Sequence, residues 1–312
     1  MTRFFNSDEV RIQLDANRCF AAVRSAMVDL STISVAQPLR QIVPVAPGKV
    51  FASMPGLLKG SGLVGAKIVT AFPSLEDPRR SQHRGLVAGF DDETGVLLGV
   101  ADAGQVTLIR TAVASAVATR ELACPGFKTC AILGTGEQAL SHVRIFSELF
   151  SITRFTIWGR NPGAVEGFIA QAGEVGAAIE GAATVADAVA EADVICTVTS
   201  ASEPILKTEW VRPGTHINAI GSSFAGPREI DSPLVAASRF FADCRPYALV
   251  AAAEFLDAKE HGLVDDAHIV AEIGEVIAGT KPGRRYDEEI TLYKSLGHVV
   301  QDLAALRCLL DG

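Results

Sequence analysis

The chain has 312 residues, 48% of them apolar, with a formal net charge of −8 and an isoelectric point near 5.3. This length allows two domains of ordinary size with full cores. The acidic balance argues against a nucleic-acid-binding protein, because it offers no general attraction for a polyanion. No apolar stretch approaches the roughly 20 residues of a membrane span, and the N-terminus lacks the apolar core of a secretory signal.

Cysteine and histidine usage predicts neither disulfides nor a metal site. The closest histidines, His261 and His268, do not have the spacing of zinc ligands, and no Cys-x-x-Cys occurs. We therefore expect no bound metal and reduced thiols in a cytoplasmic protein. The cysteines are Cys19, Cys124, Cys130, Cys196, Cys244 and Cys308.

The first hundred residues predict an antiparallel sheet behind one leading helix. The apolar periodicity from Ser7 to Leu30 is typical of a capped amphipathic helix. Short β-rich runs separated by Pro and Gly follow, and Asp91–Gly95 has the composition of a hairpin turn. These runs are Gln41–Val45, Val50–Met54, Val64–Thr70, Gly85–Phe90 and Val96–Ala101.

The rest of the chain alternates between helices and strands. An Ala-rich helix is predicted over Thr107–Ala123 and ends at Pro125-Gly126. Such alternation predicts the α/β class with a parallel, doubly wound sheet. The predicted strands are Lys128–Leu133, Phe155–Trp158, Asp193–Cys196, His216–Ile220 and Arg239–Ala242. The predicted helices are Gln138–Phe150, Asn161–Ala177 and, after a strand or loop at Ile290–Gly297, Val299–Leu310.

A glycine-rich turn joins the first of these strands to the helix after it. The turn reads Gly134-Thr-Gly136-Glu-Gln-Ala139, the Gly-x-Gly-x-x-Ala form of the dinucleotide-binding fingerprint. The first Gly makes the turn, the second lets the backbone approach a pyrophosphate, and the small third residue lets helix and strand pack closely. The alternative is a plain glycine turn in an α/β protein.

The residues after the second strand indicate which nicotinamide cofactor is bound. An NAD site usually has Asp or Glu there, for the ribose 2′-hydroxyl. Here Gly159 stands at that point, followed by Arg160 and Asn161. A guanidinium binds a 2′-phosphate, which a carboxylate would repel. We therefore predict NADP(H) over NAD(H), unless Arg160 is only a solvated turn residue.

Six motifs occur in the order of a known family. Between about Gln37 and Asp302, the chain resembles the ornithine cyclodeaminase/μ-crystallin family. The motifs are Met54-Pro55, Gly65-Ala-Lys67-Ile-Val-Thr70, Thr107-Leu-Ile-Arg110-Thr111-Ala112, Ile132 to Ala139, Asn218-Ala-Ile-Gly221 and Lys294-Ser-Leu-Gly297. The resemblance implies a Rossmann domain, 119–291, inserted in a discontinuous α+β domain for dimerisation and substrate binding, 1–118 plus 292–312. It also implies a homodimer.

The resemblance assigns substrate binding to Arg40, Lys67 and Arg110. The residues support this, since a Lys in an apolar strand needs an anion and an Arg can clamp a carboxylate. Each could instead be a solvated edge, surface or loop residue. The cofactor contacts that the resemblance implies are Arg110, Thr111, Gly134, Thr135, Gly136, Glu137, Gln138, Ala139, Gly159, Arg160, Asn161, Thr197, Val198, Thr199, Ala219, Gly221 and Ser295.

One departure from the family pattern indicates the reaction. Cyclodeaminases and alanine dehydrogenases of the family resemble Asn-Ala-x-Gly-x-Asp after the fifth strand, and this chain has Ser223 at the acidic position. A serine hydroxyl is a poor general acid or base near neutral pH. Glu229 or Asp231 could in principle substitute, although both resemble solvated or capping residues.

The sequence therefore predicts an NAD(P)H-dependent reductase of 2-imino acids, such as Δ1-pyrroline-2-carboxylate, Δ1-piperideine-2-carboxylate or an open-chain imino acid. Lys67 would give the imine its proton, and Ser223 would orient the nitrogen or a water. Alternatives are an ornithine cyclodeaminase, a non-catalytic μ-crystallin-like protein that binds NADPH and a small ligand, and an oxidative amino-acid dehydrogenase.

Overall fold

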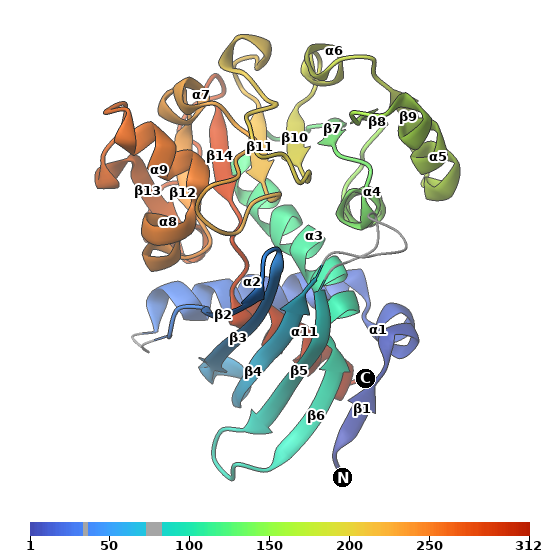
Figure 1. The fold of residues 1–312 in the computed structure, drawn as a ribbon, viewed down its shortest axis with the longest axis vertical. Coiled ribbons are helices and arrows are strands. Elements are labelled where there is room, and N and C mark those ends of the chain that lie inside the picture. Colours follow the sequence, from blue (N-terminus) through green and yellow to red (C-terminus); the bar gives the residue numbers. More distant parts are fainter. Residues whose placement is uncertain (34–36, 73–82) are drawn as a thin grey trace. The chain divides into compact units, whose positions relative to one another are not determined.

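The computed structural model describes residues 1–33, 37–72 and 83–312 (Figure 1). The chain forms two compact units, Met1–Ala114 with Gly297–Gly312, and Ser115–Leu296. These boundaries differ from the predicted 118/119 and 291/292. Helix α3 (Ala103–Leu122) runs across the first boundary, and strand β14 (Thr291–Lys294) belongs to the sheet of the second unit. The sequence predicted a helix over Thr107–Ala123 and a strand or loop at Ile290–Gly297, but a local pattern shows neither where along the helix the first core ends nor which sheet β14 joins.

The first unit contains a six-stranded sheet in the order β1-β6-β5-β4-β3-β2. All neighbours are antiparallel except β1 and β6, which are parallel. Its strands are β1 (Arg3–Phe5), β2 (Gln41–Ala46), β3 (Lys49–Leu58), β4 (Leu63–Ala71), β5 (His83–Asp91) and β6 (Leu97–Asp102). Its helices are α1 (Ser7–Gln13), α2 (Ala16–Thr32), the start of α3 and α11 (Val299–Leu310), with a 3-10 turn at Lys59–Ser61.

The single leading helix predicted from the sequence is wrong, because two helices occupy that segment. Asn6 and Glu9 form a capping box at the start of α1, which ends at Gln13. Asp15 then caps α2 by accepting from the backbone N–H of Arg18 at 2.8 Å. A side chain that bonds to an N–H three residues later starts a new helix even within a continuous amphipathic pattern.

Helices α2 and α11 pack together, and α11 covers one face of the first sheet (Figure 1). Side chains of β4 alternate accordingly, with Leu63, Lys67 and Val69 buried and Val64 and Ile68 exposed. Nearly every residue of α11 is buried. A charged side chain on the covered face therefore has to find its counterion inside this unit.

The second unit contains an eight-stranded sheet in the order β13-β12-β14-β11-β10-β7-β8-β9, with every neighbouring pair parallel. The order reverses beside β7, so the sheet is doubly wound and the predicted fold class is confirmed. Its other strands are β7 (Thr129–Leu133), β8 (Arg154–Trp158), β9 (Ala178–Gly181), β10 (Val194–Thr197), β11 (His216–Ala219), β12 (Arg239–Ala242) and β13 (Ile269–Glu272). Its further helices are α4 (Glu137–Leu149), α5 (Pro162–Ala172), α6 (Val185–Val189), α7 (Ser232–Ala237), α8 (Arg245–Ala251), α9 (Ala253–Glu260) and α10 (Ile273–Ile277), with 3-10 turns at Thr208–Trp210 and Asp266–His268.

All five strands predicted for this sheet are present, and three further strands join it. Strands β9 and β13 lie at the two edges, where short, half-exposed runs give weak patterns. Strand β14 lies between β11 and β12, although it comes last in the sequence. Among the described residues, no helix is both long and apolar enough to cross a membrane.

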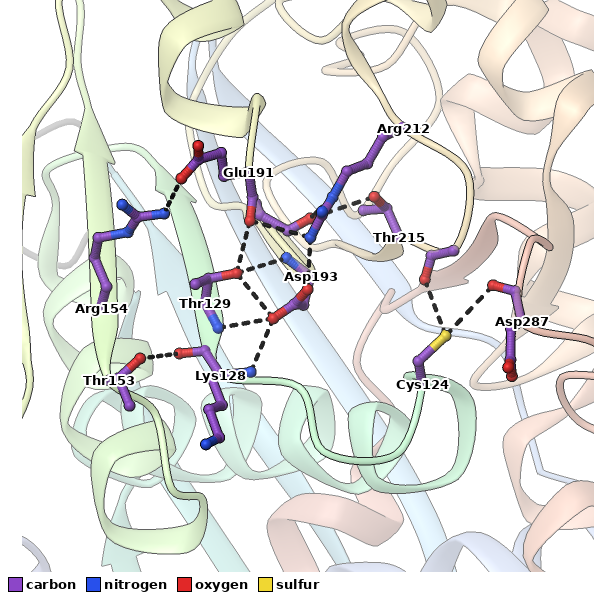
Figure 2. A network of polar contacts seen from close by, with 12 residues as sticks. Cys124, Lys128, Thr129, Thr153, Arg154, Glu191, Asp193, Arg212, Thr215 and Asp287 are labelled. Atoms are coloured by element: carbon purple, nitrogen blue, oxygen red, sulfur yellow. Dashed lines mark hydrogen bonds and ion pairs between the residues drawn. The ribbon is translucent and has the colours of Figure 1, made fainter.

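A polar network at the amino ends of β7 and β10 centres on Asp193 (Figure 2). Its Oδ2 accepts from the backbone N–H groups of Lys128 and Thr129 at 2.9 and 3.0 Å, and Arg212 donates to Oδ1 at 2.5 Å. Burial alone would raise the pKa of Asp193, but these donors outweigh it and hold the pKa below its ordinary value. The network ties the starts of two central strands. A surface cavity of about 400 Å³ beside it, lined by Thr129 and Arg154 among others, lies at the opposite edge of the sheet from the glycine turn.

Candidate functional site

The glycine turn leaves the carboxyl end of β7 in a shape that only glycine allows. Gly134 has a φ of 136°, and a Cβ there would lie 2.8 Å from the carbonyl oxygen of Val198. No atom of the described residues lies within 4 Å of a Cβ built on Gly136, so this part of the chain leaves the backbone open there. Ala139 is fully buried, as close packing of helix on strand requires. The turn has the geometry that brings backbone against a pyrophosphate.

Helix α4 begins directly at this turn, with Gly136 as its N-cap and Glu137 as its first residue. Its first turn is anchored by the buried His142, whose Nδ1 donates to the carbonyl oxygen of Gln138 at 2.8 Å. Nε2 then accepts from the hydroxyl of Ser115 at 2.9 Å. Burial lowers the pKa of His142 to about 4, so the ring is neutral at physiological pH. The helix start is thereby held rigid where its dipole favours an anion.

The segment after β8 is tightly packed at Gly159, where a larger residue would require Thr135 to shift. A Cβ on Gly159 would lie 2.7 Å from Cγ2 of Thr135. Arg160 follows on the exposed surface, and Asn161 caps α5 by accepting from the N–H of Gly163 at 3.0 Å. This position therefore carries no carboxylate for a ribose 2′-hydroxyl, and the guanidinium of Arg160 follows it in the chain.

The remaining predicted cofactor residues of this unit lie just beyond the carboxyl ends of neighbouring strands. The N–H of Val198 donates to the oxygen of Leu133 at 2.9 Å, and that of Ser295 donates to the oxygen of Ala219 at 3.0 Å. The N–H of Gly221 donates to the oxygen of Thr197 at 3.2 Å. The ends of β7, β10, β11 and β14 are therefore bonded into one edge, where α/β sheets bind ligands.

The acidic side chains near Ser223 are committed to structural contacts. Asp231 caps α7 by accepting from the N–H of Leu234 at 3.0 Å, as the sequence suggested. The expectation that Glu229 is solvated or a cap is wrong, because this residue is fully buried and accepts four hydrogen bonds from the ends of β10 and β11. Ser223 itself is half-buried in the loop after β11. Neither carboxylate replaces the acid that the chain lacks.

In the first unit, Lys67 of β4 and Arg110 of α3 share one carboxylate. Lys67 Nζ lies 3.1 Å and Arg110 Nε lies 2.9 Å from the same oxygen, Oδ1 of Asp302. Arg110 Nη1 also donates to Oε1 of Gln301 at 2.8 Å, and Lys67 Nζ donates to the hydroxyl of Thr107 at 2.5 Å. All three charged side chains are at least 95% buried. Within the described part of the chain, two buried cations therefore face a single carboxylate.

Electrostatics keep this cluster ionised but leave the lysine a weak acid. Burial alone would raise the pKa of Asp302, but Arg110 and Lys67 outweigh it and hold the pKa below its ordinary value. Burial lowers the pKa of Lys67 to about 8, with Asp302 opposing this and Arg110 adding to it. The Lys67 ammonium can thus release a proton close to neutral pH.

The other predicted residues of this unit lie along the same elements. Arg40 Nη2 donates to the carbonyl oxygen of Gly297 at 3.4 Å, and a Cβ on Gly297 would lie 3.0 Å from Nη1 of Arg110. Gly297 therefore lies against both guanidinium groups. Thr111 is buried next to Arg110 on α3. Whether Arg110 and Thr111 also bind the cofactor stays a prediction.

The sequence reasoning missed Asp302. It lies 235 positions from Lys67 and 192 from Arg110, so no local motif joins them. The sequence did contain a signal, because Asp302 is a charged residue within the run Val299–Leu306, which is apolar apart from Gln301 and Asp302. An acid on a helix that is buried all round needs a cationic partner.

Comparison with known proteins gives full-length matches. The model of the ornithine cyclodeaminase/mu-crystallin family matches residues 2–312. The ketimine reductase mu-crystallin of Rattus norvegicus is 38% identical over 315 residues, which is 99% of this chain and 96% of the relative. The structure of Thermococcus litoralis Delta(1)-pyrroline-2-carboxylate reductase in complex with NADH and L-proline has a TM-score of 0.94 and 27% identity, and the match covers 99% of this chain and 97% of that one. An archaeal alanine dehydrogenase dimer with bound NAD has a TM-score of 0.91 and 28% identity, with 99% and 95% covered.

The shared carboxylate predicts a large stability effect. Asp302→Asn leaves two buried cations without an anion, and we expect a loss of about 3–5 kcal/mol in the free energy of unfolding, measured by urea denaturation at pH 7. Asp311→Asn is the matched control, because Asp311 pairs with Arg307 on the surface of the same helix and should change stability by less than about 1 kcal/mol. Equal losses for the two variants would contradict the account.

Proposed function

The chain belongs to the ornithine cyclodeaminase/mu-crystallin family, as its motifs predicted, and we propose that it is an NAD(P)H-dependent reductase of 2-imino acids. The substrates we favour are cyclic imines that carry a carboxylate, of the Δ1-pyrroline-2-carboxylate or Δ1-piperideine-2-carboxylate type. The product would be the corresponding amino acid. The relatives named as ketimine and pyrroline-2-carboxylate reductases support this choice.

The observation that carries the proposal is the charge imbalance at Lys67, Asp302 and Arg110. Among the described residues, these two buried cations share one carboxylate oxygen. Burying excess charge is costly unless a further anion is bound. A substrate carboxylate supplies that anion, and a guanidinium can hold it by two parallel hydrogen bonds.

The residues of the second unit fit a dinucleotide. The open backbone at Gly136, the start of α4 and the bonded strand ends would hold the pyrophosphate and the nicotinamide. When bound, the reduced cofactor supplies the hydride that the imine carbon accepts. The protein's part is to bind, orient and exclude water.

Lys67 would supply the proton. With its pKa near 8, Nζ is an ammonium at neutral pH and can give a proton to the imine nitrogen as carbon is reduced. Asp302 would hold Nζ in place during the transfer. Ser223 would orient the nitrogen or a water without changing its own charge.

Two observations count against a cyclodeaminase. Deamination with ring closure needs an acid at the position of Ser223, and both nearby carboxylates, Glu229 and Asp231, are taken up by structural hydrogen bonds. Reduction of a preformed imine needs only the proton of Lys67. A non-catalytic binding protein would bind the cofactor without consuming it in the presence of any imine.

For the cofactor, we propose NADP(H) over NAD(H). Arg160 is exposed beside the turn, where it can meet a 2′-phosphate, and Thr135 occupies the space that an acidic side chain at Gly159 would need. The structure of the Thermococcus relative contains NADH, so a preference for NADP(H) would distinguish this chain from that relative. A cytoplasmic location remains the expectation from the sequence.

We also propose a homodimer built on the uncovered face of the first sheet. Five large apolar side chains on that face are 36–39% exposed, and they include the cross-strand pairs Ile68 with Leu86 and Val64 with Phe90. A contiguous apolar face of this kind marks an interaction surface. The alanine dehydrogenase relative is described as a dimer.

The activity is tested with purified protein, NADPH and a panel of cyclic and open-chain imino acids, with ornithine as a parallel assay for ammonia release. We expect NADPH oxidation with at least one imino acid and none of the ammonia expected from a cyclodeaminase. Lys67→Met should lower kcat/KM at least about 100-fold, while the exposed Lys281→Met should have no effect. Because Nζ acts as an ammonium, kcat/KM should fall as the pH rises through about 8. No oxidation with any member of the panel would sink the proposal.

The cofactor preference is tested by Arg160→Ala. Losing a charge-assisted contact to the 2′-phosphate should weaken NADPH binding about 10- to 100-fold and leave NADH binding unchanged. The readout is the dissociation constant of each cofactor, measured by fluorescence titration. Equal effects on the two cofactors would show that Arg160 does not bind the phosphate.

The dimer is tested by sedimentation equilibrium. The unaltered protein should have twice the 32.8 kDa mass of one chain, and Ile68→Glu should reduce it to one. Val250→Glu, at an apolar and more exposed position of the second unit, is the control and should leave the mass unchanged. A single-chain mass for the unaltered protein would contradict the proposal.

A further inference from the structure

Glu229 is a buried acid that the proposed reaction does not use. Its side chain has no exposed surface, and both carboxylate oxygens are saturated. Oε1 accepts from the backbone N–H and the hydroxyl of Thr199, each at 2.6 Å. Oε2 accepts from the hydroxyl of Thr197 at 2.6 Å and from the N–H of Gly221 at 2.8 Å. One carboxylate therefore joins the segment after β10 to the segment after β11.

The ionised form of Glu229 satisfies all four donors at once. Two of them are backbone N–H groups, which cannot turn round to accept a proton in return, whereas the hydroxyl groups of Thr197 and Thr199 can. Burial raises the pKa of Glu229, and the hydroxyl and amide donors oppose this rise. The side chain bridges the two segments, and its ionised form accepts most strongly from the two fixed N–H groups.

Gly221 is shaped to the carboxylate. A Cβ at this position would lie 2.3 Å from Cδ and 2.4 Å from Oε1 of Glu229, and 2.2 Å from the carbonyl oxygen of Thr199. The absence of a side chain at Gly221 thus makes the space that Glu229 fills. This explains the glycine without a direct contact to a ligand.

A buried ion pair, Glu254 with Lys294, contacts the backbone of Glu229. The N–H of Glu229 donates to Oε1 of Glu254 at 3.3 Å, and Oε2 of Glu254 lies 2.8 Å from Nζ of Lys294. Neither Glu254 nor Lys294 has exposed surface. Because Lys294 ends β14, the network links the ends of β10, β11 and β14 with helix α9.

The linked segments form one half of the dinucleotide site. The glycine turn and Arg160 lie after β7 and β8, on the side of the sheet that takes the phosphates and the adenosine. A dinucleotide crosses the point where strand order reverses, so its nicotinamide lies over β10 and β11. We propose that Glu229 is a positioning residue, which holds Thr197–Thr199 and Gly221 in the shape that binds the nicotinamide half of the cofactor. This inference rests on the proposed cofactor and not on the identity of the substrate.

The experiment compares binding of the whole cofactor with binding of its adenosine half. In Glu229→Gln, one of the two oxygens becomes an NH2 group, which cannot accept a hydrogen bond from a backbone N–H. Either Thr199 or Gly221 therefore loses its acceptor, and that segment is released. We expect the affinity for NADPH to fall about 10-fold or more while the affinity for 2′,5′-ADP changes less than about twofold, both by calorimetry. Glu289→Gln is the control, because Glu289 is also buried in this unit and accepts from Arg285 away from the strand ends. No imine is present, so the result is independent of whether the protein reduces one.

A purely structural Glu229 would give a different result. Both affinities would then fall together, or neither would change, and either outcome overturns the inference. If Glu229→Gln did not fold, Thr199→Val, which removes one hydroxyl donor, takes its place. Thr199→Val should also weaken NADPH binding more than 2′,5′-ADP binding, by a smaller factor than Glu229→Gln. An unchanged ratio of the two affinities overturns the inference. Failure of the unaltered protein to bind NADPH would overturn both this inference and the proposed cofactor.

Discussion

The ion cluster of Lys67, Arg110 and Asp302 is the interaction on which the account depends. One carboxylate oxygen accepts from both cations inside the first unit, where none of the three side chains reaches water to any extent. Among the described residues, the carboxylate contacts both cations but can neutralise only one. We propose that the remaining charge makes this cluster a site for a carboxylate ligand, and burial leaves Lys67 acidic enough to give up a proton.

The second unit uses a buried carboxylate in a comparable way. Glu229 fixes Thr199 and Gly221 at the carboxyl ends of two strands, just as Asp302 fixes two cations on a strand and a helix. Arg110 and Lys67 hold the pKa of Asp302 below its ordinary value, whereas burial raises the pKa of Glu229 against its four donors. We therefore propose two kinds of residue in each unit: groups that bind the ligand, and buried carboxylates that hold those groups in position. The lone proton donor, Lys67, belongs to the first set.

Local patterns predicted what local physics determines. The glycine turn at Gly134, the alternation of strands with helices and the helix at Val299–Leu310 could all be read from neighbouring residues, because their causes lie within one or two turns of chain. The place of β14 between β11 and β12 could not, nor could the partners of Lys67 and Arg110, since these pairings join residues between 52 and 235 positions apart. The prediction of a single leading helix failed for another reason. The side chain of Asp15 caps a second helix, although the apolar pattern continues through this point. Asp302 was visible only as an acid in a largely apolar run, and no local pattern marks Glu229 as buried.

The most direct test of the central claim follows the hydride itself. The protein is incubated with Δ1-pyrroline-2-carboxylate and NADPH carrying deuterium at nicotinamide C4, and the proline formed is analysed by mass spectrometry. The account predicts proline with one deuterium at Cα for each NADPH oxidised. Unlabelled proline, or ornithine converted to proline without net oxidation of NADPH, would contradict it.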